Sequence, residues 1–291
     1  MTNGTTMKRQ DFRFFDRLRV RWAEIDAQKI VFNGHYLMYF DTAIAAYWRA
    51  LAMPYAETMH ALGGDLYVRK ATLEYLASAR YDDVLDIGTR CARIGNSSIL
   101  FTAAVFRQDD LLVSGELVYV FADPHSQTSK PVPESLRKVL LGFEAGESML
   151  DVRTGSWDEL GRHARALREE VFVAEQKIPL ELEWDAADAS AIHAVAFNRF
   201  GLPLATGRLI VEEGAPARIG RMATSRLVRS SGIGRHVLDA LTAAARSRGV
   251  RELMLHAQTS AQNFYLRAGF APRGAVFEEA GIAHIEMRRA L

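Results

Sequence analysis

The stretch Arg229-Ser230-Ser231-Gly232-Ile233-Gly234-Arg235-His236 decides how the second half of this 291-residue chain is interpreted. It follows a strand-like run that ends near Thr224, and an amphipathic run begins at Arg235, so the backbone should leave a strand and enter a helix. Such a turn presents unpaired N–H groups and the positive end of the helix dipole, which suit a phosphate. Val237 replaces the third glycine of a dinucleotide fingerprint, and the Gly-Lys-Ser/Thr of a P-loop is absent. The pattern that remains is Arg-x-x-Gly-x-Gly.

Composition and length set the class of protein. The chain is 49% apolar and 24% charged, which is typical of a soluble globular protein, and it is long enough for two domains. Its formal net charge is +1, which argues against a nucleic-acid partner. Residues 1–10 lack the apolar core of a signal peptide, so we expect a cytoplasmic protein.

The number of cysteines, the spacing of histidines and the length of the apolar runs argue against a disulfide, a metal site and a membrane span. The single cysteine, Cys91, excludes an intramolecular disulfide. The eight histidines and the cysteine show no ligand spacing, so no metal is expected. The longest apolar run, near Ile99–Phe106, is far shorter than the roughly 18–20 residues of a membrane span, so no membrane partner is expected.

The sequence of the first half predicts a first strand within Phe12–Ile25, then one long helix, and then four further strands. After Asn33-Gly34-His35, apolar residues recur at helical spacing, and Pro54 ends the run: Tyr36, Phe40, Ala43, Ile44, Tyr47 and Leu51. Short turn signals then separate four strand-like runs: Tyr67–Tyr75, Val84–Ile94, Ser98–Arg107 and Leu111–Ala122. This order predicts an α+β domain in which an antiparallel sheet packs around one long helix.

The second half alternates strands and helices. The expected strands are Met149–Ser156, Ala194–Phe200, Pro203–Val211, Ile219–Val228, Leu253–Ala257 and one within Glu278–Met287, and the expected helices are Trp157–Val173, Arg235–Arg248 and Ala261–Ala268. This order predicts an α/β domain, a mixed sheet with helices on both faces. The composition of 142–148 suits a linker, so we expect domains at 11–146 and 147–291.

Further motifs of the second half carry a family resemblance. Asn263-Phe264-Tyr265 and Gly269-Phe270 follow the glycine turn at the spacing found in the acetyl-CoA site of the GNAT superfamily of N-acetyltransferases, which this half resembles. Further segments resemble its ElaA-like branch: Leu167–Gln176, Arg218–Ala223, His256–Gln258 and Glu278–His284. The resemblance covers essentially all of 149–291 and implies a GNAT fold that transfers acetyl from acetyl-CoA to an amine.

The resemblance also implies roles for single residues. Tyr265 matches the general acid that protonates the departing CoA thiolate, and Asn263 would help to hold CoA. The preceding strand would pair with pantetheine and the turn would hold the pyrophosphate, through Met222, Ala223, Thr224, Arg229, Ser230, Ser231, Gly232, Ile233, Gly234 and Arg235. The base that deprotonates the acceptor amine stays open among Glu170, Glu175, His256 and His284.

An acidic segment of the same half has a different interpretation. Glu181, Glu183 and Asp185 are expected to form a solvated loop, whose charge could repel an acidic acceptor and favour a cationic one.

The first half resembles the hotdog-fold acyl-CoA thioesterases of the 4-hydroxybenzoyl-CoA thioesterase type. The resemblance rests on Val20–Asp26 and Val31–Asp41, and Leu73–Asp83 and Pro133–Arg137 extend it to about residue 143. It implies that Asp26 attacks the thioester or activates water, and that backbone N–H groups near Asn33 and Gly34 polarise the carbonyl.

Three departures keep an alternative open. Ile25, Lys29 and Asn33 stand where this family commonly has Thr, Gly and His, and Lys29 could pair with Asp26 or block the acyl pocket. In that alternative Asp26 only shapes a turn, the hotdog only binds CoA or dimerises, and the GNAT half alone is an enzyme. In a third hypothesis, the GNAT half is a non-catalytic acetyl-CoA sensor. Glu24 and Asp41 are expected to be strand-edge and helix-surface charges.

The two resemblances together predict a bifunctional enzyme. It would hydrolyse acyl-CoA in the first half and transfer acetyl in the second, with acyl-CoA and acetyl-CoA as substrates and no prosthetic group. Because hotdog domains of this family pair their sheets, we expect a homodimer or a higher homo-oligomer.

Overall fold

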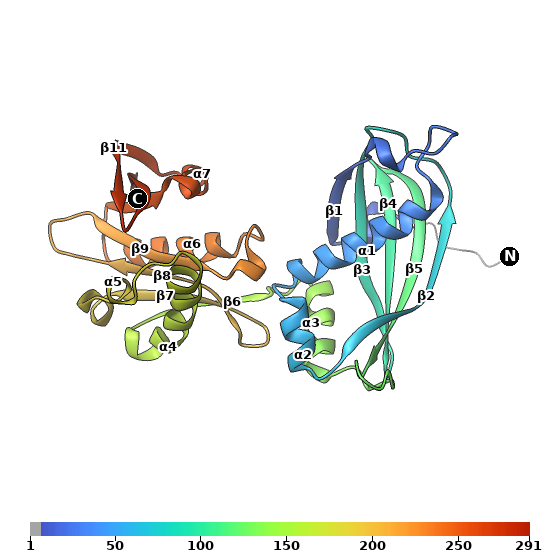
Figure 1. Ribbon diagram of the computed structural model, residues 1–291, viewed down its shortest axis with the longest axis horizontal. Helices are drawn as coiled ribbons and strands as arrows, with labels where there is room; N and C mark the ends of the chain where they lie inside the picture. The colour runs from blue at the N-terminus through green and yellow to red at the C-terminus, as the bar shows by residue number, and fades with distance from the viewer. Residues whose placement is uncertain (1–6) are drawn as a thin grey trace. The chain divides into compact units, whose positions relative to one another are not determined.

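The strands of the protein belong to two sheets (Figure 1). In the computed structural model, which describes residues 7–291, one sheet has five strands and the other seven. The five-stranded sheet lies in a unit that ends at Met149, and the seven-stranded sheet lies in a unit that runs from Leu150 to Leu291.

The first unit is an antiparallel sheet around one long helix, as predicted. Its strands are ordered β1-β3-β4-β5-β2, and every neighbouring pair is antiparallel. The elements are β1 (Phe14–Arg19), α1 (Asn33–Ala50), α2 (Tyr55–Ala61), β2 (Asp65–Tyr75), β3 (Val84–Ile94), β4 (Ser98–Arg107), β5 (Asp110–Ala122) and α3 (Glu134–Glu144).

Helix α1 lies against the sheet because its apolar residues recur on one face. Phe40, Ala43 and Tyr47 are fully buried, and Ile44 is nearly so. Gly115 on β5 makes this close approach possible, since a Cβ there would stand 2.6 Å from the Phe40 ring. The spacing of the apolar residues on α1 and the absence of a side chain at Gly115 therefore both favour the packing of α1 against the sheet.

The second unit is a mixed sheet with helices on both faces, also as predicted. Its order is β11-β12-β10-β9-β8-β7-β6, and β9 and β10 are its parallel pair. Helices α4 and α6 pack on the same central strands from opposite faces (Figure 1). The elements are β6 (Leu150–Gly155), α4 (Trp157–Arg168), a π-helical turn (Glu169–Glu175), α5 (Leu180–Glu183), β7 (Ile192–Asn198), β8 (Pro203–Ile210), β9 (Ala217–Thr224), α6 (Ile233–Arg246), β10 (Glu252–Gln258), α7 (Gln262–Arg267), β11 (Ala271–Glu279) and β12 (Ile282–Ala290).

Several elements of the second unit differ from the sequence predictions. The strand expected over Ile219–Val228 ends at Thr224, and Arg226–Val228 forms a 3-10 helix. The helix expected over Trp157–Val173 changes to π geometry at Glu169, a form often found at functional sites. The single strand expected within Glu278–Met287 is part of a hairpin, β11 and β12, whose turn residues Ala280 and Gly281 both have positive φ. The exposed β11 contains Pro272 and Gly274, which read as turn signals in the sequence.

Among residues 7–291, no helix is both long enough and apolar enough to cross a bilayer.

Candidate active sites

The glycine turn before α6 is shaped to receive a negative charge. Gly232 has φ +85°, in the left-handed region that favours glycine, and Ile233 begins the helix. A Cβ at Gly234 would stand 3.0 Å from Thr224 Oγ1, so the second glycine lets α6 approach β9. Within residues 7–291, no hydrogen bond is donated by the backbone N–H of Gly232, Ile233 or Gly234. These groups can therefore bind phosphate oxygens.

A cavity of about 550 Å³ opens along this turn. The predicted CoA-binding residues that line it are Met222, Thr224, Arg229, Ser230, Gly232, Ile233, Gly234 and Arg235. Three others lie outside the lining: Ala223 packs against Val171 and Phe172, the Ser231 hydroxyl donates to the Val228 carbonyl, and Asn263 is exposed on α7.

Arg229 is held by a carboxylate from the π-helical turn. Its Nη1 and Nη2 donate to the two oxygens of Glu175 at 2.6 Å each, and its Nε donates to the Thr224 carbonyl at 3.0 Å. The hydrogen bonds from Arg229 lower the pKa of Glu175. Glu175 therefore positions the turn, and its pairing makes it a weak proton acceptor.

A second cavity opens where β9 and β10 separate. Among the described residues, the partners of these parallel strands are Ala217 with Leu253 and Arg218 with Met254. Further along β9 the pairing with β8 shifts, and Arg221 has φ +53°. The diverging strands border a cavity of about 480 Å³.

Tyr265 stands between the two cavities. Met222, Ala261 and Tyr265 line both of them, so the cavities meet at this tyrosine. Tyr265 is buried, and burial raises its pKa to about 12. No hydrogen bond of its hydroxyl to another described residue is present, so the group is a protonated donor without a protein partner.

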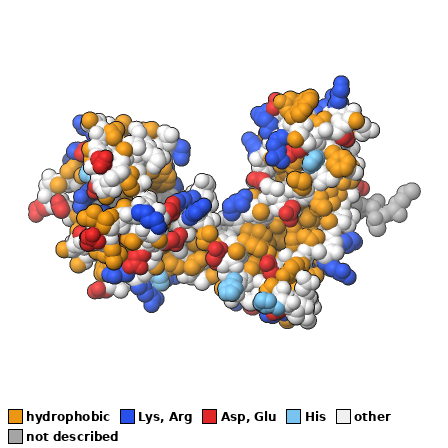
Figure 2. All heavy atoms as spheres, in the orientation of Figure 1, with side chains coloured by type: hydrophobic (Ala, Val, Ile, Leu, Met, Phe, Trp, Pro, Cys, Tyr) orange, Lys and Arg blue, Asp and Glu red, His pale blue; other side chains and the backbone are white. Residues whose placement is uncertain are grey.

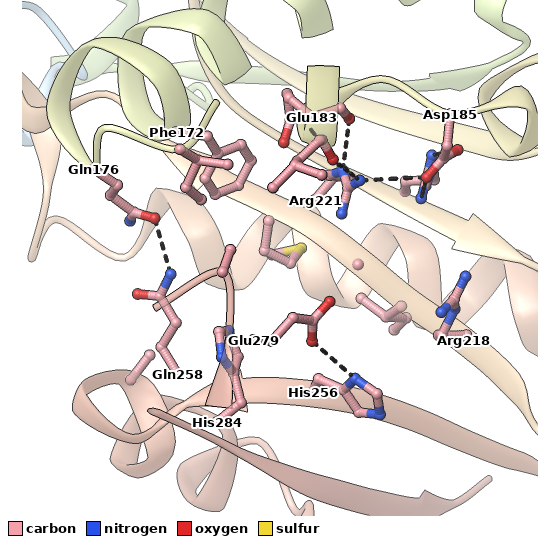
Figure 3. Close-up of a pocket in the computed structure, with 18 of the residues that line it drawn as sticks. Phe172, Gln176, Glu183, Asp185, Arg218, Arg221, His256, Gln258, Glu279 and His284 are labelled. Atoms are coloured by element: carbon pink, nitrogen blue, oxygen red, sulfur yellow. Dashed lines mark hydrogen bonds and ion pairs between the residues drawn. The ribbon is translucent and has the colours of Figure 1, made fainter. Parts of the chain in front are cut away.

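Two of the four candidate bases face the second cavity (Figure 3). His256 on β10 and His284 on β12 both line it. His256 Nδ1 lies 3.2 Å from Glu279 Oε2. Because a carboxylate can only accept, this contact favours the tautomer with the proton on Nδ1, in which Nε2 is the acceptor. His284 Nδ1 contacts the Ile282 carbonyl at 2.8 Å, without a carboxylate.

The two glutamates lie elsewhere. Glu170 accepts from the Ser225 hydroxyl at 2.8 Å, and Glu175 is paired with Arg229. Neither lines the second cavity. Within residues 7–291, no group of three or more His, Cys, Asp and Glu side chains is placed to hold a metal ion.

The prediction of a solvated acidic loop is wrong for Glu183. Of the three acidic residues, Glu181 alone is exposed without an ion pair to another described residue, whereas Glu183 is 2% exposed and receives hydrogen bonds from Arg168. Arg168 is 1% exposed and also donates to Asp188 at 2.8 Å. Its guanidinium stacks on Trp184 at 4.5 Å.

Two further arginines complete this buried ion network. Arg208 donates to Asp185 at 2.6 and 2.8 Å and to Asp188 at 2.7 Å, and these bonds lower the pKa of Asp185 to about 2. Arg221 lies 3.4 Å from Glu183 and 3.3 Å from Asp185 (Figure 3). The sequence could not reveal the network because the partners are far apart along the chain. The three guanidinium groups and three carboxylates cancel in charge.

In the first unit, Asp26 and the start of α1 meet at one cavity. A cavity of about 530 Å³ is lined by Asp26, Asn33, Tyr36 and Tyr75, among others. Asp26 Oδ1 accepts from the N–H groups of Gln28 at 2.8 Å and Ile30 at 3.4 Å. In the described structure Oδ2 has no hydrogen-bond partner, and no bond is donated by the Asn33 or Gly34 N–H. A free carboxylate oxygen therefore lies near free helix-end N–H groups, although Gly34 is not in the cavity lining.

Lys29 is not placed to block this cavity. Its side chain is exposed and absent from the lining, and no ion pair with Asp26 is present among the described residues. Its φ is +62°, which explains why a glycine suits this position in the family the half resembles. The contact that would favour a non-catalytic hotdog is thus not found in residues 7–291.

Glu24, expected at a strand edge, is a buried structural group. It is 3% exposed, accepts from Arg21 Nε at 2.8 Å and from the Tyr39 hydroxyl at 2.8 Å. Burial acts to raise its pKa, but these hydrogen bonds outweigh burial and lower it. Its carbonyl accepts from the Phe32 N–H at 3.0 Å, so Glu24 supports the start of α1. Asp41 is exposed on α1, as expected, and accepts from Tyr119 at 3.2 Å.

Comparisons with known proteins agree with this architecture. Residues 28–114 match the Thioesterase superfamily, and residues 188–291 match the Acetyltransferase (GNAT) domain. The first unit therefore belongs to the thioesterase superfamily and the second to the GNAT acetyltransferases.

Individual relatives match one unit each. The Bacillus subtilis protein named "Uncharacterized N-acetyltransferase YjcF" is 33% identical over 133 residues, 45% of this chain and 94% of that protein. The Escherichia coli O6:H1 "Acyl-CoA thioester hydrolase YbgC" is 28% identical over 120 residues, 41% of this chain and 89% of that protein. The crystal structure of an acyl-CoA N-acyltransferase from Pseudomonas aeruginosa is 35% identical, with a TM-score of 0.44, and covers 48% of this chain and 99% of its own.

Replacing Lys29 tests its position. Relief of the left-handed strain, about 1–2 kcal/mol, exceeds the entropy cost of glycine, so Lys29→Gly should stabilise the first unit by up to about 1 kcal/mol. Urea unfolding measures the change, and acyl-CoA hydrolysis should stay within about threefold of wild type. The control Ala27→Gly, at an exposed turn residue without positive φ, should instead destabilise. A large change in hydrolysis for Lys29→Gly would show that the lysine acts on the site.

Proposed function

We propose that this chain is a bifunctional CoA-thioester enzyme. Residues 11–146 would hydrolyse acyl-CoA, and residues 147–291 would transfer acetyl from acetyl-CoA to an amine. The observation that carries the proposal is the meeting of two cavities at Tyr265, one beside a phosphate-binding turn and the other beside His256. For the first unit, the supporting observation is the free Asp26 oxygen near the N-terminus of α1.

Hydrolysis would use the two groups at the Asp26 cavity. The thioester carbonyl carbon would lie near Asp26 Oδ2, which attacks it or takes a proton from an attacking water. The N–H groups at the start of α1 would stabilise the negative charge that develops on the carbonyl oxygen. The C–S bond then breaks and CoA leaves as a thiolate that takes up a proton, from Asp26 in the water route. In the nucleophilic route, water afterwards hydrolyses the acyl–Asp26 anhydride and releases the acid. The similarity to YbgC, which is named an acyl-CoA thioester hydrolase, supports this activity.

Asp26→Asn tests the hydrolase. The amide oxygen can still accept from Gln28 and Ile30, so the loop should stay folded, while the loss of the negative charge should lower kcat at least about 100-fold. Release of free thiol from a panel of acyl-CoAs measures it. Asp41→Asn, at an exposed carboxylate outside the cavity, is the matched control. Wild-type hydrolysis no faster than the uncatalysed background would remove the thioesterase proposal, and equal catalysed hydrolysis by wild type and Asp26→Asn would remove the role of Asp26.

Acetyl transfer would use Tyr265 and His256 as an acid and base pair. The acceptor amine attacks the acetyl carbonyl carbon while His256 Nε2 takes a proton from the amine nitrogen. The C–S bond breaks, and the Tyr265 hydroxyl donates its proton to the CoA thiolate. Glu279 would orient His256 through the bond to Nδ1 and stabilise the imidazolium that forms.

Variants of the two residues test this pair. Tyr265→Phe should lower kcat about 100-fold with little change in the binding of acetyl-CoA, because the ring packing is kept and only the proton donor is lost. His256→Gln should lower kcat/KM by a similar factor and remove the acidic limb of its pH profile, which reports protonation of the base.

Two comparisons make the result decisive. His284→Gln, a histidine of the same cavity without a carboxylate partner, should change kcat/KM less than about threefold. Glu279→Gln should lower kcat/KM less than His256→Gln does, since the base remains while its anionic partner is lost. If His284→Gln abolishes the acidic limb and His256→Gln does not, the base is His284. Unchanged transfer by Tyr265→Phe would contradict the assignment of Tyr265 as the general acid, whereas absence of transfer by the wild type would favour the acetyl-CoA sensor.

We also propose that the first unit forms a homodimer through β2. This strand is at the edge of the sheet, and its other neighbour position is open among the described residues. Val68 on β2 and Leu76 beside it are more than half exposed, as are Phe32 and Met38 near α1. Figure 2 shows hydrophobic side chains gathered on the visible face of this unit. A second copy would cover this surface and lie beside Tyr75, which lines the Asp26 cavity.

Sedimentation velocity tests the dimer. Wild type should sediment with about twice the mass of the 32.5 kDa chain or a higher multiple, because an apolar edge strand seeks a partner. Val68→Lys should yield monomer, whereas Leu180→Lys, at an exposed apolar residue of the second unit, should not. Wild-type monomer at tens of micromolar would contradict the proposal.

A further inference from the structure

Most of the charged side chains that line the second cavity form ion pairs with other residues of the protein. Its carboxylates Glu183 and Asp185 are engaged by guanidinium groups of the buried ion network. Arg208 and Arg221 are engaged in the same network. These groups therefore offer an acceptor no net charge, and the expectation that this segment attracts a cation loses its basis.

Two charged residues of the lining lie outside the network. Glu279 contacts His256, the proposed base. Arg218 lines the cavity from β9, and no ion pair or side-chain hydrogen bond joins it to another residue in 7–291 (Figure 3). The cavity thus presents one negative group beside the proposed base and one unpaired positive group.

The position of Arg218 along β9 separates it from the reaction centre. Arg218 stands opposite Met254, where β9 and β10 are still paired, whereas Met222 borders the CoA cavity with Tyr265. Four residues of a regular strand span about 13 Å, and the irregular backbone at Arg221 shortens the distance between these two Cα atoms to roughly 10–13 Å. An arginine side chain of about 6 Å and a six-carbon chain of about 7 Å together match that span.

We propose that the acceptor is a primary amine that carries an acidic group several bonds from the nitrogen. Its amine lies at Tyr265 and His256, and its acidic group lies against Arg218, whose planar fork binds carboxylate or phosphate oxygens. A diamine would place a second cation against Arg218, and an α-amino acid has its carboxylate too close to the nitrogen to reach it. This inference rests on the proposed acetyl transfer.

Acceptors of equal carbon number test it. Acetyl transfer is measured with ε-aminocaproate, hexylamine, hexamethylenediamine and norleucine, and with aminohexyl phosphonate as the second kind of acid. Wild type should use ε-aminocaproate or the phosphonate with a kcat/KM about 10-fold above the other three. Arg218→Gln should reduce this ratio to near one, and Arg218→Glu should favour the diamine. Arg246→Gln, at an exposed arginine of α6 outside both cavities, should keep the wild-type ratio.

Binding separates failure of this inference from failure of the reaction. Calorimetry with CoA present measures each amine on wild type and Arg218→Gln. Binding of ε-aminocaproate that Arg218→Gln weakens, without any transfer, would support the acceptor class and refute the acetyltransferase. Transfer with no preference for the acidic amines, or a preference that Arg218→Gln leaves unchanged, would overturn the acceptor class alone. Neither binding nor transfer would overturn both.

Discussion

The second unit depends on the interrupted pairing of β9 and β10. Parallel strands need a crossover, and here α6 supplies it, so the chain leaves β9 through the glycine turn and returns in β10. Because the two strands pair only at their beginnings in the described structure, their ends diverge, and α7 places Tyr265 in the opening. The turn, the tyrosine and His256 are brought together by this one gap in the sheet.

Ion pairs hold together the residues that border this gap. The network joins α4, β8, β9 and the end of α5 through three guanidinium groups and their carboxylates, and two of these guanidinium groups, on Arg168 and Arg208, are buried. Removing one partner of such a pair typically costs about 3–5 kcal/mol, since the other charge stays buried without compensation. The network therefore stabilises the cavity wall and removes its own charge from substrate recognition, so charge recognition depends on Arg218 and Glu279.

The two candidate sites offer different groups, an acceptor in the first unit and a proton donor in the second. In the first, loop N–H groups bind one oxygen of Asp26 and leave the other free, which suits attack or proton removal. In the second, burial raises the pKa of Tyr265 to about 12, which keeps a proton available for a leaving thiolate. Both sites lie near a helix start with free N–H groups, at α1 and α6.

The sequence by itself determined the features that depend on neighbouring residues. The strands Val84–Ile94 and Ser98–Arg107 were predicted to the residue, because turn signals and β-rich runs are read within about ten positions. The turn at Arg229–Gly234 was found for the same reason. The tertiary structure alone decided that Glu183 is buried, that His256 has a carboxylate partner and that Lys29 is exposed outside the cavity lining. Each of these depends on side chains that folding brings from distant positions, or on a backbone angle, and neither is encoded in the local pattern.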